Sequence, residues 1–116
     1  MFDITMCSPT FFGVTRRSPT NRMMNPGNPP DKGLAMRQWL PLYKSYRQDG
    51  LRVGVMEARP GLEDMTFVAN AGLPVRGHFI LSNFLENERR REKSYHGNHF
   101  GTVYGFDKII SLSCWR

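Results

Sequence analysis

The spacing of the apolar residues changes several times along this chain, and each spacing predicts a different element. β-Branched and aromatic residues surround Pro9 and Gly13 near the start. This pattern is typical of a short edge strand within 4–15, where a proline removes no ladder hydrogen bond. The stretch 16–30 contains several prolines and asparagines without an apolar period, which predicts a long ordered loop. Loops of this length are often functional.

A helical period follows the loop. Asp31 is a candidate N-cap and Gly50 a candidate C-terminal stop, because these residue types satisfy or end the exposed turns of a helix. Between them the apolar residues recur every three or four positions and predict one buried stripe; they are Ala35, Trp39, Leu42, Tyr43 and Tyr46. Pro41 interrupts the pattern because it cannot donate to the carbonyl of Arg37. We therefore expect either a kink or two shorter helices that meet there.

Short apolar runs after Gly50 predict strands. Residues 51–55 alternate with a period of two. Two further runs, at 65–68 and 73–75, also predict strands. Arg76-Gly77 then predicts a turn that leads into the strand expected at 78–82. Past Asn83 the pattern weakens, although Ile109, Ile110 and Leu112 could form a last strand. The order predicts an α/β unit, and because one helix cannot cover both faces of its sheet, the unit needs neighbours.

Composition narrows the class of protein. The 116 residues are 40% hydrophobic and 22% charged, as in an ordinary globular domain. The longest apolar runs are a few residues, whereas a membrane-spanning helix needs about 20. No basic start followed by an apolar core is visible, so we expect a cytoplasmic protein without a secretory signal. The two cysteines, Cys7 and Cys114, lie at opposite ends and predict reduced thiols rather than a disulfide framework.

The net charge of +6 raises the question of a nucleic-acid partner. Clustered basic residues would favour phosphate binding. Here the densest basic run is diluted by acidic residues within 86–93, and Arg16, Arg17 and Arg22 lie far away in sequence. We therefore interpret this run as a solvated surface and do not expect nucleic-acid binding.

Three stretches form a specific pattern when they are compared together. They are Met6–Val14, Asn21–Pro26 and Pro60–Leu73, the last with Pro-Gly, an Asp, a Phe and Ala-Asn-Ala-Gly in register. On these motifs the chain resembles the amino-terminal part of the guanidino-group-modifying enzymes, the superfamily of arginine deiminases, amidinotransferases, dimethylarginine dimethylaminohydrolases and arginine dihydrolases. Further matches extend the resemblance over about residues 5 to 96; they are Gln38-Trp39, Leu81–Phe84, Glu88-Arg89 and Glu92.

The resemblance implies a fold and an activity. The fold would be a partial pentein-type α/β propeller, with the first blade and part of the second, in a truncated chain. Residues 1–96 would form the amino-terminal part of the hydrolase domain and 97–116 a divergent tail. Ala69-Asn70 resembles the arginine dihydrolase branch, which converts arginine to ornithine, ammonia and carbon dioxide, more than the dimethylarginine branch. Neither a cofactor nor a metal is implied.

The resemblance also implies four substrate-binding residues. Asp64 and Asn70 would accept hydrogen bonds from the planar guanidinium, Asn21 would add a polar contact, and Arg89 would pair with the substrate carboxylate. The sequence also allows a role without substrate binding for each of these four residues. Asp64 could cap backbone amides, Asn21 and Asn70 could be turn residues, and Arg89 could be solvated.

The family's cysteine nucleophile and histidine have no counterpart in this sequence, so we expect the chain to be inactive alone. Cys114 with His96 or His99 is a weak substitute, because nothing around Cys114 matches the family; the same histidines lack a convincing third ligand for zinc. A rival hypothesis is a non-catalytic interaction module that binds a full-length partner, or a second copy of itself, through an exposed sheet edge.

Overall fold

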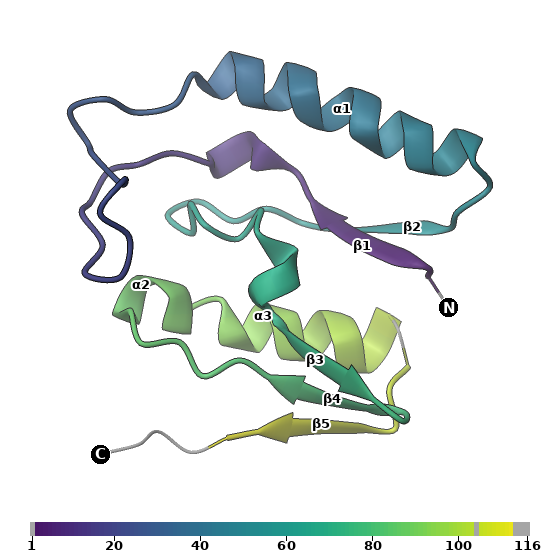
Figure 1. Ribbon diagram of the computed structural model, residues 1–116. Helices are drawn as coiled ribbons and strands as arrows, with labels where there is room; N and C mark the ends of the chain where they lie inside the picture. Colours follow the sequence, from purple (N-terminus) through teal and green to yellow (C-terminus); the bar gives the residue numbers. More distant parts are fainter. Residues whose placement is uncertain (1, 104, 113–116) are drawn as a thin grey trace.

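The strands form two small sheets in the computed structural model, which describes residues 2–103 and 105–112 (Figure 1). In the first sheet, β1 (Ile4–Cys7) pairs in parallel with β2 (Val53–Met56). The second sheet has the order β3-β4-β5, antiparallel and then parallel, and consists of β3 (Gly72–Val75), β4 (His78–Leu81) and β5 (Lys108–Ser111). This is a mixed α/β arrangement, as expected, while its assignment to propeller blades stays a prediction.

The helix α1 (Lys32–Gln48) runs alongside the β1–β2 sheet (Figure 1). Its bounds confirm the predicted caps, since the Asp31 side chain accepts from the Leu34 N–H and Gly50 has a φ of +83°. Pro41 lies inside this single helix, so the alternative of two helices is wrong.

The buried stripe predicted for α1 is only half-buried. No residue of the helix is fully buried, and Leu42 is 47% exposed. The physical reason is the narrowness of the sheet: two strands about 4.8 Å apart are narrower than a helix with its side chains. One face of α1 therefore stays largely open.

Two expected strands differ in the structure. The first strand ends at Cys7, and Pro9 begins the 3-10 turn Pro9–Phe11 instead of sitting within the strand. The run 65–68 is not a strand. Its backbone forms successive local turns, in which the Phe67 N–H donates to Asp64, and these lead into the 3-10 helix Val68–Asn70. Local hydrogen bonds thus use the donors that a sheet would have needed.

The later elements agree with their predictions. Arg76 and Gly77 have φ values of 47° and 81°, which is the backbone of the two-residue hairpin turn expected between β3 and β4. The charged run forms the short helix α2 (Asn87–Arg90), which leads into α3 (Lys93–Asn98) and the π-helical turn His99–Val103. In Figure 1, α3 lies against the three-stranded sheet, of which the expected last strand is a member.

One core joins both sheets. Phe79 of β4 stacks on Phe100 with ring centroids 4.0 Å apart. The buried cluster takes residues from the first sheet, the connecting turns and the second sheet; its members are Cys7, Met56, Leu62, Met65, Ala71, Phe79, Leu81 and Phe100. The π-helical turn His99–Val103 contacts β5 of the same sheet, while the proposed boundary at residue 96 stays a prediction. None of the described helices has the length and apolar character to cross a membrane.

Candidate functional site

A pocket of about 430 Å³ opens between the loop after β1, the turns before β3 and the start of α2. All four residues implied by the family resemblance line it: Asn21, Asp64, Asn70 and Arg89. These residues are far apart in the sequence, so the fold has brought them together. Asp64 and Asn70 in particular share one hollow, as the guanidinium hypothesis requires.

The rest of the pocket wall combines apolar and hydroxyl side chains. Phe12 and Phe67 meet edge to face with their ring centroids 5.6 Å apart. Val14, Met23 and Met24 extend this apolar side, and Ser18, Thr20 and Glu86 complete the polar side. Such a wall can hold an aliphatic stem with a charged head.

Arg89 is held mainly by Glu92. Its Nε and Nη2 atoms donate to the two carboxylate oxygens of Glu92 at 2.8 and 3.1 Å, and its guanidinium lies 4.4 Å from the centre of the Phe84 ring. Nη2 also donates to the backbone oxygen of Asp64, and Nη1 donates to Asn70 Oδ1 at 2.8 Å. The edge that would grip a substrate carboxylate in a bidentate manner is therefore occupied, and Nη1 retains one donor for a ligand.

The amide and carboxylate groups keep free capacity. Asn70 Oδ1 accepts from Arg89, and Asp64 Oδ2 accepts from Arg16 at 2.9 Å. No donor among the described residues contacts Asp64 Oδ1. Asn21 forms the turn that its sequence alternative predicted, because its Oδ1 accepts from the Met23 N–H. It lines the pocket as well.

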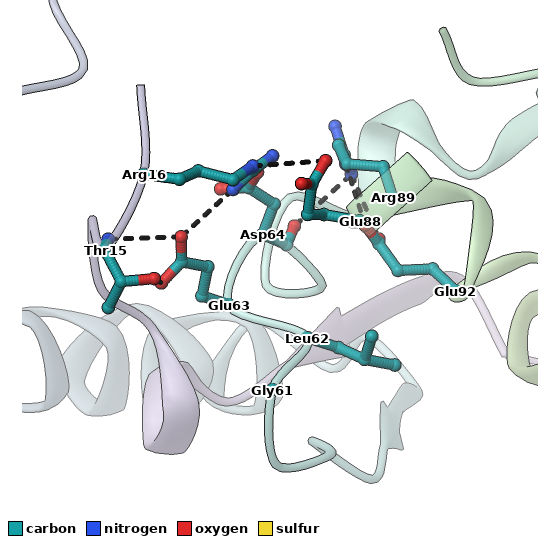
Figure 2. A pocket seen from close by; sticks show the side chains of 9 residues that line it. All are labelled: Thr15, Arg16, Gly61, Leu62, Glu63, Asp64, Glu88, Arg89 and Glu92. Carbon is teal, nitrogen blue, oxygen red and sulfur yellow. Dashed lines mark hydrogen bonds and ion pairs between the residues drawn. The ribbon is translucent and has the colours of Figure 1, made fainter. Parts of the chain in front are cut away.

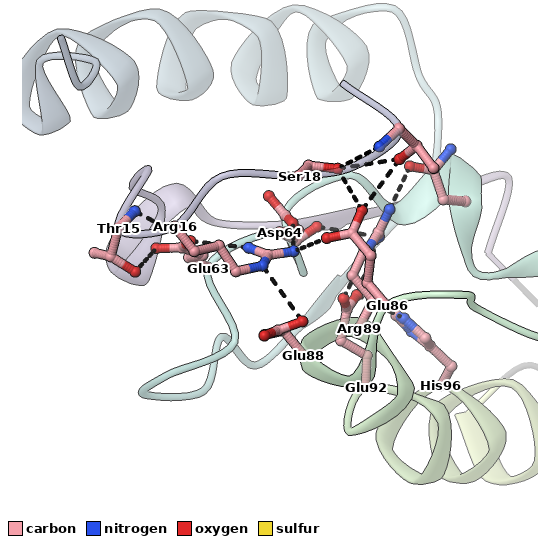
Figure 3. Close-up of polar contacts among 12 residues, drawn as sticks. Thr15, Arg16, Ser18, Glu63, Asp64, Glu86, Glu88, Arg89, Glu92 and His96 are labelled. Atoms are coloured by element: carbon pink, nitrogen blue, oxygen red, sulfur yellow. Dashed lines mark hydrogen bonds and ion pairs between the residues drawn. The ribbon is translucent and has the colours of Figure 1, made fainter. Parts of the chain in front are cut away.

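Arg16 is the principal residue that the sequence analysis missed. Its guanidinium donates to carboxylates of Glu63, Asp64 and Glu86 at 3.0, 2.9 and 2.6 Å, and Glu88 lies 3.5 Å from Nε (Figures 2 and 3). Burial alone would lower the pKa of Arg16, but the hydrogen bonds to Asp64 and Glu86 outweigh it and raise that pKa above its ordinary value. Arg16 therefore stays charged at every physiological pH.

The loop around Arg16 adds hydroxyl donors to the same carboxylates. Thr15 donates to Glu63, and Ser18 donates to Glu86 Oε1 at 2.6 Å (Figure 3). Thr20 donates to the same oxygen at 3.2 Å. The Ser18 hydrogen bond, followed by Arg16, lowers the pKa of Glu86. The available sequence signal was a group of three hydroxyl residues and two arginines in 15–20, with acidic residues elsewhere in the chain as partners.

Part of the charged run is buried, which corrects its interpretation as solvated surface. Glu92 is 1% exposed and His96 is completely buried, with His96 Nε2 3.2 Å from Glu92 Oε1. Burial raises the pKa of Glu92, but hydrogen bonds from His96 and Arg89 outweigh it and lower the pKa overall. The spacing of three and four residues between Arg89, Glu92 and His96 was the signal for this network.

The described cysteine and histidine residues that were considered for a nucleophile or a zinc site do not line this pocket. Cys7 is buried at the end of β1, and burial, with the charge of Glu92, raises its pKa to about 11. Cys114 lies outside the described residues. Burial, with the nearby His96, lowers the pKa of His99, and within the described residues no three His, Cys, Asp or Glu side chains are grouped to hold a metal.

Comparison with known proteins finds no matching family model but does find relatives in sequence. The chain is 32% identical to the bifunctional arginine dihydrolase/ornithine cyclodeaminase AgrE of Nostoc sp. over 115 residues, which span 90% of the chain and 15% of that protein. It is 30% identical to the N(G),N(G)-dimethylarginine dimethylaminohydrolase of Mycobacterium tuberculosis over 98 residues, 84% of the chain and 32% of that protein.

Solved structures of similar proteins point to the same relatives as the sequence comparison. An AgrE variant in a binary complex with L-arginine superposes with a TM-score of 0.79 at 26% identity, over 94% of this chain and 16% of that one. The amino-terminal domain of the arginine dihydrolase ArgZ, bound to its product, gives a TM-score of 0.78 at 25% identity, over 94% of this chain and 38% of that one. The chain thus spans a minor part of each relative.

Proposed function

Because the chain is a distant homologue of the amino-terminal part of arginine dihydrolases and of dimethylarginine dimethylaminohydrolase, we propose that it forms the guanidinium-binding side of a hydrolase. The reaction would break carbon–nitrogen bonds of a guanidino compound. The substrate we propose is arginine, with ornithine, ammonia and carbon dioxide as products, in keeping with the relative that binds L-arginine.

One observation carries the proposal: Asn21, Asp64, Asn70 and Arg89 line the same pocket. A guanidinium presents N–H donors in one plane and needs acceptors around it. Asp64 Oδ1 supplies such an acceptor, and the phenyl rings on the apolar side can hold an aliphatic stem. The free Nη1 donor of Arg89 suits the carboxylate of an amino acid.

We propose further that these residues bind arginine without hydrolysing it. Neither a cysteine nor a histidine is among the described residues that line the pocket. The buried Cys7 thiol, with its pKa raised to about 11, is a poor nucleophile because attack requires the thiolate. The nucleophile and proton carrier would come from a polypeptide that supplies the remainder of the relatives' fold.

Titration calorimetry with L-arginine tests the proposal. We expect saturable binding of L-arginine, weaker binding of asymmetric dimethylarginine, and none of L-citrulline, which keeps the shape but replaces the cation by a neutral ureido group. Asp64→Asn should weaken arginine binding about tenfold or more, since a charge-assisted hydrogen bond is lost. The same samples should release no ammonia.

Asp49→Asn is the matched control, because Asp49 is exposed at the end of α1, outside the pocket. It should bind arginine like the wild type. Equal affinity for arginine and citrulline, or an unchanged affinity of Asp64→Asn, would refute the proposal. A preference for dimethylarginine would instead assign the chain to the dimethylarginine branch.

A second candidate is a non-catalytic interaction module. It is favoured by two open hollows, of about 360 and 390 Å³, that share Val68 and Ala69 and have apolar side chains such as Trp39 and Phe106 in their walls. Contiguous apolar surface of this kind often marks a protein interface. Stable association with an intact arginine dihydrolase in sedimentation velocity, without arginine binding by the chain alone, would favour this candidate.

A further inference from the structure

We propose that Arg16 is the positioning residue of the pocket. Its guanidinium holds the loop 14–24 against an acidic cradle formed by the carboxylates of Glu63, Asp64 and Glu86. It also fills this cradle, which a ligand guanidinium would otherwise enter. The part of this proposal that concerns the ligand rests on the proposed function. The part that concerns the loop stands on the contacts alone.

The cradle combines three separate segments. Glu63 and Asp64 belong to the turn before β3, Glu86 precedes α2, and Arg16 comes from the loop after β1 (Figure 3). The side chains of these three acids are 11–15% exposed and that of Arg16 is 16% exposed. An interaction shielded from water to this degree is stronger than an exposed ion pair.

Electrostatic balance makes the cradle dependent on Arg16. With Glu88, four carboxylates surround one guanidinium, so removal of Arg16 would leave four like charges close together. Like charges at such distances destabilise one another. The turn before β3 and the start of α2 would then separate, or would draw in another cation.

The shape of guanidinium explains why an arginine is needed. Nη2 serves Asp64 and Glu86 at the same time, while Nη1 serves Glu63. A planar fork with five donors can reach acceptors on three sides. A lysine ammonium has the charge but is a compact donor group, so it cannot replace these contacts together.

The cradle also places residues of the binding pocket. Arg16 fixes Asp64 Oδ2, which leaves Oδ1 for a ligand. Glu86 accepts from Ser18, and Ser18 forms a backbone bridge with Asn21. The position of Asn21 on the pocket wall therefore depends on the same cluster as the orientation of Asp64.

The cradle itself has no room for an amino acid. The hollow beside Arg16, lined also by Glu63, Glu88 and Glu92, has a volume of only about 50 Å³ (Figure 2). The neighbouring pocket has about 430 Å³. Arg16 thus divides an acidic region into an occupied part and an open part, and directs a ligand guanidinium to the open one.

Hydrogen exchange and arginine titration on Arg16→Ala and Arg16→Lys test the proposal, with Arg17→Ala as the matched control. Arg17 is the adjacent residue with the same charge, and its exposed side chain contacts Asn25 at 3.4 Å. In Arg16→Ala we expect amides in 14–24 to exchange about tenfold faster or more, because several charge-assisted hydrogen bonds are lost, and arginine to slow this exchange again because its guanidinium can enter the vacated cradle. Arg17→Ala should stay within about twofold of wild type.

Chemical rescue separates positioning from general stability. Millimolar guanidinium chloride should restore the protection of 14–24 in Arg16→Ala, whereas the same concentration of ammonium chloride should not. Arg16→Lys should keep α1 protected yet exchange rapidly in 14–24; if Arg16→Ala unfolds altogether, this variant decides. Wild-type protection of the loop in Arg16→Lys, or identical patterns in Arg16→Ala and Arg17→Ala, would overturn the proposal.

The proposed arginine binding and the positioning role of Arg16 can be refuted separately. If the wild type binds no arginine, the proposed function is lost, but the exchange of 14–24 in the Arg16 variants still decides whether Arg16 positions the loop. If arginine binds and the loop is indifferent to Arg16, the positioning role alone is lost.

Discussion

At the scale of single residues, Glu86 shows how the loop is held by ionised groups. Its two oxygens accept from Arg16, Ser18 and Thr20. The pKa of Glu86 lies below its ordinary value of 4.5, which means that folding favours the ionised form. Its contribution to stability is therefore present above pH 4.5 and is lost as the pH falls through the lowered pKa.

The lowered pKa of Glu86 predicts that the free energy of unfolding depends on pH. In urea unfolding between pH 7 and pH 3, the wild type should exceed Glu86→Gln in unfolding free energy at neutral pH, by about 1–3 kcal/mol. The difference should shrink below pH 4.5, because Glu86 then becomes protonated and neutral like glutamine. Glu57→Gln is the control, since Glu57 has a 78% exposed side chain. A difference that stays constant across this range would contradict the assignment.

At the scale of elements, α1 contains a local conflict that its surroundings tolerate. Pro41 cannot donate to the Arg37 carbonyl, yet the helix continues through it from Lys32 to Gln48. The exposed position of Pro41 lets water satisfy the freed carbonyl. The narrow sheet beneath α1 gives little packing energy in return.

Replacement of Pro41 should therefore stabilise the chain. Pro41→Ala restores one N–H and should raise the free energy of unfolding by about 1–3 kcal/mol. Pro41→Gly restores the same N–H with a poorer helix former, so its gain should be smaller by about 1 kcal/mol. Chemical denaturation followed by circular dichroism measures both; a loss of stability in Pro41→Ala would show that the proline is required by packing.

At the scale of the whole molecule, the chain is flatter than its length suggests. It measures 45 × 43 × 21 Å with a radius of gyration of 15.0 Å, whereas a compact chain of this size has about 13 Å. One thin core must therefore join both sheets. Met65, which is 1% exposed, lies in the buried cluster that unites them.

Two methionines allow a matched test of this thin core. Met65→Ala should lower the free energy of unfolding by about 2–5 kcal/mol, through lost burial and a residual cavity. That is a large part of the stability of an ordinary domain. Met23→Ala removes the same atoms from a residue that is 90% exposed and should change stability by at most about 0.5 kcal/mol. Similar effects in urea unfolding would show that Met65 is not part of a shared core.

The sequence by itself determined the elements whose signals are local. The caps Asp31 and Gly50 bound α1, and the hairpin turn at Arg76-Gly77 was signalled by Gly77, a residue type that readily adopts a positive φ. The motifs that carry the family resemblance also identified four residues that line one pocket. These signals are readable because each lies within a few residues of its effect, or within a recognised motif.

Only the tertiary structure decided the remainder. Arg16 and Glu86 are 70 residues apart, and nothing near either one specifies the other. The burial of Glu92 depends on what packs over it, and 65–68 forms turns because its amide donors find local acceptors. Pairings and burial across such separations are properties of the assembled core, since a charge or an apolar residue acquires its energy from neighbours that folding brings to it.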